Sequence, residues 1–305
     1  LHLSIRRQRQ MCIRDRLIRI YFRYICVQNR SMYTEYQPSH LLVPYIDSYW
    51  EFKGNPDYGM RIHILPDGCT DFIFTLGEVA NAVEEGSLIM QPYRSYFVGP
   101  MTKYSELVTY TESIHMFGVR FLPCGLSCFT NLPLHEFVNS RVSTNEMKAV
   151  FDDTFIEKLG EQKHVTDRIR VVEEYLLAYL ARHYQPADSH VAMAVNMINH
   201  SKGKRSVRSL MDDVCLCQRH FERKFKHYTG FTPKEYSRIV KFKNAVELLR
   251  TTTSANLLTT AVDAGYYDLA HFSKEIKSMS GNTPASFLSL TVPEETTLTY
   301  IEPQR

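Results

Sequence analysis

Two basic segments carry the side chains of this chain that are best suited to binding nucleic acid. The first reads HFERKFKHYTGFTP, from His220 to Pro233, and the second reads HFSKEIKSMSGNTP, from His271 to Pro284. Both begin with the same dipeptide and end in Gly-x-Thr-Pro, at an offset of 51 residues throughout. Lysine and arginine bind phosphate, and arginine also pairs with guanine through two hydrogen bonds. The duplicated segment therefore indicates an interface with nucleic acid.

The first segment has the spacing of an amphipathic helix that ends at a glycine. Phe221 and Phe225 are four positions apart and are expected to face inward. Gly230 is expected to end the helix, and Thr232 and Pro233 are expected to begin the next one as N-cap and first helical residue. The other faces of the helix present four charged residues: Arg219, Glu222, Arg223 and Lys226.

Each copy reads as two short helices joined by a tight turn. In the first copy, a helix that begins after Ser206 and covers VRSLMDDVC precedes a helix over 218–228. In the second copy, a helix over 257–263 precedes a helix over 269–279, in which Phe272 and Ile276 repeat the inward pair. Each copy is therefore predicted to be a helix-turn-helix unit with a basic second helix.

A long helix between the two copies suggests how one chain could read two stretches of DNA. The helix is expected to run from Pro233 to about Arg250. Because successive major-groove faces are roughly 34 Å apart, a rigid spacer between two reading helices can match that repeat within a monomer.

The charge distribution supports this division of the chain. The whole chain has a net charge of +3, yet residues 32–189 carry −9 and residues 190–290 carry +7. An acidic body joined to a basic region indicates that one part meets phosphate and the other does not. The alternative is a solvated basic face.

The two ends of the chain are expected to lie outside the folded domains. Residues 1–31 carry eight arginines and no small-residue cleavage site, so they are a poor match to a signal peptide. They are expected to be a non-native or disordered extension, with Met32 as the native start, and a basic arm that touches DNA is the alternative. Residues 291–305 are expected to form a flexible tail. No apolar run approaches the roughly 20 residues that cross a bilayer.

The acidic body, residues 32–185, is predicted to be an antiparallel β domain with a helical extension. Short β-rich runs with Gly and Pro between them favour a sandwich or barrel. RIHIL and TDFIFTL, on either side of Asp67-Gly68, are expected to form a hairpin, and 165–183 a long amphipathic helix. The fold class is therefore α+β: a barrel-like N-terminal domain and an all-α C-terminal domain with two helix-turn-helix units.

Other residues with chemical potential form no complete site. His63 and His115 lack the HxH-plus-Glu cluster of a cupin metal site, and Cys124-x3-Cys128 has no second pair nearby. We therefore expect no enzyme, no metal and no cofactor. A thiol- or metal-responsive switch through Cys215 and Cys217, or through Cys124 and Cys128, is the alternative function.

The basic region resembles the C-terminal DNA-binding domain of AraC/XylS-type transcription regulators through two segments, RSVRSLMDDVCLCQRHFERKFKHYTGFTPKEYSRIVKFKNAVELLR and AVDAGYYDLAHFSKEIKSMSGNTPASF. The signature F-K-x3-G-x-[ST]-P, which the second copy repeats with Ile276 in place of Phe, carries the likeness over 190–290. The body, with ILPDGCTDFIF, YFVGP and GVRFLPCG, resembles the uncharacterised barrel-like N-terminal domain that many such regulators carry, and it is expected to sense a signal or to dimerise.

The resemblance implies a set of DNA-contacting residues. The first reading helix should present Gln218, Arg219, Glu222, Arg223 and Lys226, and the second should present Leu269, Ala270, His271, Ser273, Lys274 and Lys277. Ser206 and Thr232 are expected to contact the DNA backbone. This sequence departs from the family pattern at several positions. These include Cys217, where a capping serine is expected, and Leu269, where a polar residue that contacts bases is common. Glu222 could also serve as a partner for Arg219 or Lys226.

The partners follow from the resemblance. We expect a cytoplasmic bacterial regulator that binds double-stranded promoter DNA and works with RNA polymerase. A small-molecule effector and a homodimer are left open, as is the choice between activation and repression. No membrane partner is expected.

Overall fold

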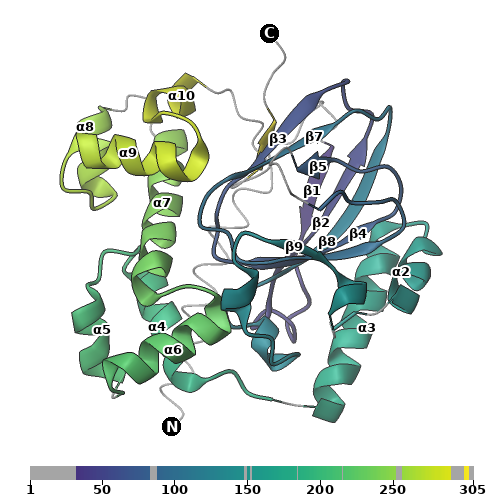
Figure 1. Ribbon diagram of the computed structural model, residues 1–305, viewed down its shortest axis with the longest axis horizontal. Helices are drawn as coiled ribbons and strands as arrows, with labels where there is room; N and C mark the ends of the chain where they lie inside the picture. Colours follow the sequence, from purple (N-terminus) through teal and green to yellow (C-terminus); the bar gives the residue numbers. More distant parts are fainter. Residues whose placement is uncertain are drawn as a thin grey trace. The chain divides into compact units, whose positions relative to one another are not determined.

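The computed structural model describes residues 32–82, 88–147, 150–151, 153–183, 185–214, 216–251, 256–289 and 299–301. Within these ranges an antiparallel β domain precedes a helical domain, which confirms the expected α+β class (Figure 1). The extension expected at 1–31 lies outside the described residues. The strands of the β domain are β1 (Tyr33–Tyr36), β2 (Ile46–Gly54), β3 (Met60–Ile64), β4 (Thr70–Thr75), β5 (Asn81–Ala82), β6 (Ser95–Val98), β7 (Ser105–Thr109), β8 (Ile114–Phe121) and β9 (Arg141–Ser143).

The larger sheet has the strand order β1-β2-β8-β4-β6-β9 and is antiparallel throughout. Strand β8 lies at its centre between β2 and β4, and almost all of its side chains are buried. Most of its side chains are apolar because both faces of the strand are covered, and the exception in its buried part is Arg120, which is paired with carboxylates. Gly118 occurs on β8 because a Cβ there would collide with the indole of Trp50.

The hairpin expected around Asp67-Gly68 is wrong, because its two strands belong to different sheets. Strand β3 pairs with β7 and with β10 (Thr299–Ile301) in the order β10-β3-β7-β5, whereas β4 pairs with β6 and β8. Between them, the Asp67 carboxylate accepts a hydrogen bond from the Cys69 N–H at 2.8 Å. The connection thus crosses from one sheet to the other, and the described strands form two sheets rather than a closed barrel.

The C-terminal tail, expected to be flexible, contributes strand β10 to the smaller sheet. Thr299 is paired with Ile64 and Ile301 with Ile62. The edge of β3 has backbone N–H and C=O groups that can pair with a neighbouring segment. This explains why residues 299–301 form a strand there. The rest of 291–305 lies outside the described residues.

Helices and short helical turns complete the β domain. Val172 and Leu176 of α3 are fully buried, and the rings of Phe72 and Phe151 meet edge-on at 5.1 Å between centroids. Arg168 of α3 also lies 3.0 Å from Glu51 of β2. The expected helix over 165–183 is confirmed, and α2 and α3 lie beside the larger sheet (Figure 1). These elements are η1 (Leu126–Cys128), η2 (Leu134–Phe137), η3 (Thr144–Glu146), α2 (Asp153–Gly160) and α3 (Val165–His183).

The helical domain is built around one long helix. Figure 1 shows α5 and α6 near one end of α7, and α8, α9 and α10 near the other. Its core includes Phe221, Phe225, Phe272 and Ile276, none of which has measurable exposure. None of the described helices is long and apolar enough to cross a membrane. The helices are α4 (Ser189–His200), α5 (Val207–Val214), α6 (Gln218–Thr229), α7 (Pro233–Thr251), α8 (Leu257–Asp263), α9 (Leu269–Ser280) and α10 (Pro284–Ser289).

The turn between β3 and β4 connects the β domain to α7. Lys243 of α7 donates a hydrogen bond to the Asp67 carbonyl oxygen at 3.3 Å. The Asp67 carboxylate in turn lies 3.5 Å from the buried guanidinium of Arg120, which also contacts Asp71 and Glu35. Burial raises the pKa of Asp71 to about 6, against the opposing effect of Arg120. The loop that meets α7 is therefore held by a buried cluster of charges.

Candidate nucleic-acid interface

Helix α6 has the amphipathic form that its sequence predicts. Phe221 and Phe225 are buried with their rings edge-on at 5.6 Å, and Gly230 ends the helix with a φ of 83°. That left-handed conformation favours glycine because other residues pay a steric cost there. Cys217 is the N-cap and makes no side-chain capping bond, so the expected loss of a capping serine has a structural counterpart.

The exposed face of α6 presents most of the residues predicted to contact DNA. Gln218, Arg219, Arg223 and Lys226 are exposed, and Glu222 is half-buried. Glu222 accepts a hydrogen bond from Gln218 Nε2 at 2.9 Å rather than pairing with Arg219 or Lys226. Arg223 lies 3.1 Å from the Nδ1 atom of His220. Glu222 thus bonds to an amide and not to Arg219 or Lys226, although its carboxylate still adds one negative charge to this face.

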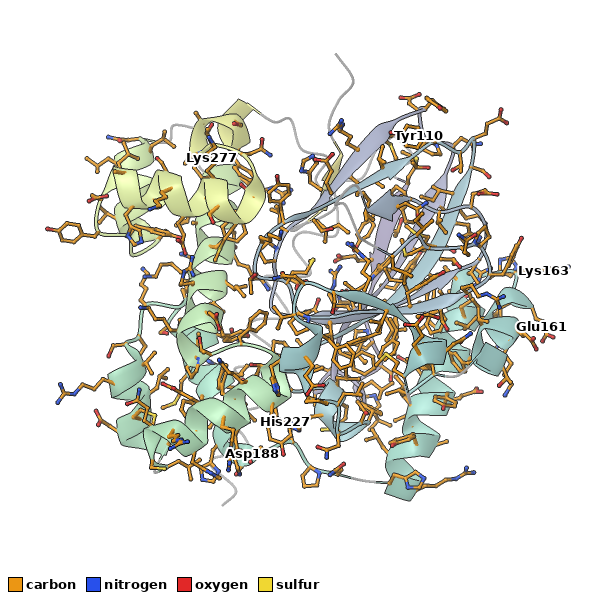
Figure 2. All side chains as sticks on the ribbon, viewed as in Figure 1. Tyr110, Glu161, Lys163, Asp188, His227 and Lys277 are labelled. Carbon is orange, nitrogen blue, oxygen red and sulfur yellow. The ribbon has the colours of Figure 1, made fainter. Side chains whose placement is uncertain are left out.

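Helix α9 repeats α6 with the same length and the same end. Its N-cap Asp268 accepts a hydrogen bond from the His271 N–H at 2.6 Å, and Gly281 ends it with a φ of 76°. Arg238 of α7 makes two hydrogen bonds to Glu275, at 2.7 and 3.1 Å, which tie the linker helix to α9. The predicted DNA-contacting residues are exposed apart from the half-buried Ser273: Leu269, Ala270, His271, Ser273, Lys274 and Lys277. Figure 2 labels Lys277 on this helix.

One exposed side chain beside α9 was missed by the sequence reasoning. Tyr267 lies directly before the N-cap and is 92% exposed. The equivalent residue in the first copy, Leu216, is half-buried and packs against the helical core. An aromatic residue where the other copy has an aliphatic one is the signal that could have identified it. Tyr267 thus adds an amphipathic group to the face formed by α9.

The two residues expected to contact the DNA backbone differ in how their hydroxyls are used. Ser206 accepts a hydrogen bond from the Ser209 N–H at 3.2 Å, which makes it the cap of α5. Thr232 donates both its N–H and its hydroxyl to Glu235, each at 2.7 Å, and accepts from the Glu235 N–H at 3.1 Å. This is a capping box. Both donors of Thr232 are therefore engaged in starting α7.

Histidine and cysteine side chains form no metal site in the described part of the chain. His115 lies 2.9 Å from Glu51, and among the described residues no group of three or more His, Cys, Asp or Glu could hold a metal ion. Cys124 and Cys128 are buried and unbridged, and burial raises the pKa of both thiols. Cys217 is exposed, and Cys215 lies outside the described residues. Of the four cysteines in the thiol alternative, Cys217 is therefore the one whose side chain is exposed among the described residues.

Comparison with known proteins divides the chain in the same way. A family model described as a domain of unknown function (DUF6597) matches residues 34–143, and a model described as a helix-turn-helix domain matches residues 210–289. No curated protein matches the chain.

A comparison with solved structures finds transcription regulators at low sequence identity. ToxT from Vibrio cholerae is 10% identical, with 80% of this chain and 100% of that chain covered and a TM-score of 0.48. A probable AraC family transcriptional regulator from Rhodopseudomonas palustris is 20% identical over 33% of this chain and 96% of that one, with a TM-score of 0.31. The xylose-binding transcription activator XylR is 18% identical over 40% of this chain and 39% of that one, with a TM-score of 0.31.

The C-terminal fold and the matched domain define a helix-turn-helix protein. The chain therefore carries a helix-turn-helix domain on the C-terminal side of a DUF6597 domain.

Proposed function

We propose that this chain is a sequence-specific regulator that reads two adjacent major-groove segments of promoter DNA with α6 and α9. The supporting observation is the pair of helices related by 51 residues, each with a buried apolar pair, a left-handed glycine at its end and an exposed face in its N-terminal half. In helix-turn-helix proteins the N-terminal residues of the second helix contact the base edges.

The proposed base contacts come from the exposed N-terminal turns of the two helices. On α6, Arg219 and Arg223 are candidates for guanine, and Glu222 with Gln218 for cytosine or adenine. On α9, His271 and Lys274 offer polar contacts, while Leu269 offers an apolar surface to a thymine methyl group. Lys226, Lys277 and Ser206 are proposed to contact phosphate. Thr232 would do so only by releasing Glu235.

The two domains are proposed to have different functions in regulation. Residues 190–290 bind DNA, and residues 32–185 sense a signal or dimerise. A cytoplasmic location, contact with RNA polymerase and a homodimer are part of the same proposal, because a promoter-bound regulator acts through such partners. The β domain has an aromatic interior, with Phe72, Phe97 and Phe117 fully buried, and no effector is assigned.

In vitro selection tests the proposal. The full chain is used to select duplexes from a random-sequence pool, and affinity for the selected duplex is then measured for variants. Each of Arg219→Ala and Arg223→Ala should lose about 1–3 kcal/mol of binding free energy, roughly 5- to 150-fold in Kd. The control Arg182→Ala, an exposed arginine of α3, should bind like the wild type. If Arg219→Ala and Arg223→Ala bind the selected duplex as tightly as the control does, the assignment of α6 as a reading helix is contradicted.

A further inference from the structure

A single loop of the β domain contacts the C-terminal ends of both proposed reading helices. The loop, 99–104, connects β6 to β7. A Cβ placed on Gly230, at the end of α6, would lie 2.5 Å from Pro100 Cγ. A Cβ placed on Gly281, at the end of α9, would lie 2.7 Å from Tyr104 Cζ. Only a hydrogen atom fits between each glycine and the loop.

The two glycines are equivalent positions of the duplicated unit. Their N–H groups make the same bond, at 2.9 Å, to the carbonyl oxygens of Lys226 and Lys277. Since α6 and α9 end in the same way, the loop reaches the same point on both helices. It contacts their C-terminal ends and leaves the exposed residues of their N-terminal turns uncovered.

The loop is held in place by bonds from the next segment of the β domain. Asn139 donates its N–H to the Pro100 carbonyl oxygen at 2.8 Å, and its side chain accepts from the Thr102 N–H and donates to the Thr102 hydroxyl, both at 2.8 Å. The ring of Tyr104 stacks on the buried imidazole of His63, with 5.8 Å between centroids. The first end of the loop is fixed by Asn139 and the other by His63.

A second contact lies next to Gly230. His227 of α6 and Asn131 of the β domain are joined by a hydrogen bond of 3.1 Å between Nε2 and Oδ1 (Figure 2 labels His227). The Leu134 carbonyl oxygen of η2 would lie 3.2 Å from a Cβ on Gly230. The end of α6 is thus held from the loop and from η2 together.

We propose that the loop 99–104 positions α6 and α9 relative to each other, with Pro100 and Tyr104 as its positioning residues. This proposal rests on the proposed function, because spacing matters only if both helices read DNA. The linker helix α7 sets the distance between the two units and is bonded to α9 through Arg238 and Glu275. The loop adds a further attachment at the end of each reading helix, which restricts rotation of the two units about α7. One base pair changes the separation of two half-sites by about 3.4 Å and rotates them by about 35°, so a fixed frame discriminates between spacings.

The first experiment measures positioning without DNA. Spin labels are attached through genetically encoded non-natural residues at Arg208 of α5 and Ser278 of α9, both exposed. Double electron–electron resonance then gives the distribution of distances between them. Tyr104→Ala and Pro100→Ala should broaden the distribution, whereas Tyr104→Phe, which keeps the ring, should leave it narrow. Tyr110→Ala, the same change at an exposed tyrosine, is the matched control. An unchanged width in both alanine variants would overturn the proposal.

The second experiment measures spacing on DNA. Affinity is compared between the selected duplex and duplexes with one base pair inserted or removed between the two protected segments. The wild type should discriminate by about tenfold, and Tyr104→Ala should reduce this to less than about threefold while binding a single half-site as the wild type does. Undiminished discrimination would refute a positioning role. A wild type that binds no duplex would instead refute the proposed function, and the label distances would still decide whether the loop positions α6 and α9.

Discussion

Tyr236 of α7 packs against Gly68 of the turn between β3 and β4, and a Cβ on Gly68 would lie 2.7 Å from Tyr236 Cε2. Gly68 also has a φ of 85°, a conformation that costs other residues about 1–2 kcal/mol. Gly68→Ala should therefore lower the free energy of unfolding by roughly 2–4 kcal/mol, from backbone strain and overpacking together.

Chemical denaturation of the two glycine variants measures this effect. Gly160→Ala is the matched control, because nothing lies within 4 Å of a Cβ at Gly160. It should change stability little or raise it by up to about 1 kcal/mol. If the Gly68→Ala variant is as stable as this control, the close contact between Gly68 and Tyr236 does not limit the size of the residue at position 68.

Lys277 should contribute to phosphate binding as a charge and not as a base reader. The slope of log K against log salt falls by about 0.9 for each phosphate contact removed, so Lys277→Gln should lower it by that amount. Lys163→Gln, at an exposed site in the β domain that Figure 2 also labels, should leave the slope unchanged. A titration of binding with salt distinguishes the two variants, and equal slopes would exclude a phosphate contact.

Two roles proposed for Glu222 predict different changes in base preference. If it accepts from cytosine, Glu222→Ala should relax the preference at one base pair by about 1–3 kcal/mol and leave the others unchanged. If it only orients Gln218 through their 2.9 Å hydrogen bond, Gln218→Ala should give the same change in preference. A selection experiment with each variant compares the preferred sequences, and a uniform loss at all positions would fit neither role.

His227 predicts a pH dependence of stability. Burial lowers its pKa and the nearby His135 lowers it further, against the opposing effect of Glu136. The folded protein therefore takes up this proton less readily than the unfolded chain. The stability from neutral His227 is complete above the ordinary pKa of 6.5 and is lost as the pH falls below it towards the lower folded pKa.

Unfolding at about pH 7.5 and about pH 5.5 tests this sign. The wild type should lose more stability between the two values than His227→Gln, whose amide can still donate to Asn131. His200→Gln, at an exposed site of α4, serves as the control and should behave like the wild type. If His227→Gln shows the full wild-type loss, another group is responsible.

The cysteines should differ in reactivity in the native state. Cys217 is exposed, whereas Cys69, Cys124 and Cys128 are buried, and burial raises the pKa of these three thiols. Brief alkylation followed by peptide mass spectrometry should find Cys217 modified and the buried three protected until denaturant is added. If an oxidant weakens DNA binding of the wild type but not of Cys217→Ser, the thiol alternative gains support. An equal response would place any switch elsewhere.

Local signals in the sequence were sufficient for the helical domain. The pairs Phe221/Phe225 and Phe272/Ile276, and the glycines that end α6 and α9, lie where the 3.6-residue period and the glycine preference for left-handed backbone predict them. The exposed faces of both helices follow from the same period. The hydrogen-bond partner of Glu222 could not be predicted in this way, because several side chains one helical turn away compete for its carboxylate.

Tertiary structure decided what depends on distant parts of the chain. The runs on either side of Asp67-Gly68 read as a hairpin, but each strand pairs with segments further along the chain, and a strand's own residues do not specify its partners. The loop 99–104 carries no motif that indicates contact with Gly230 and Gly281. By itself the sequence determined the two helix-turn-helix units, because their signals lie within a few residues. Only the folded chain brings one loop against the ends of both, because that contact joins residues more than a hundred positions apart.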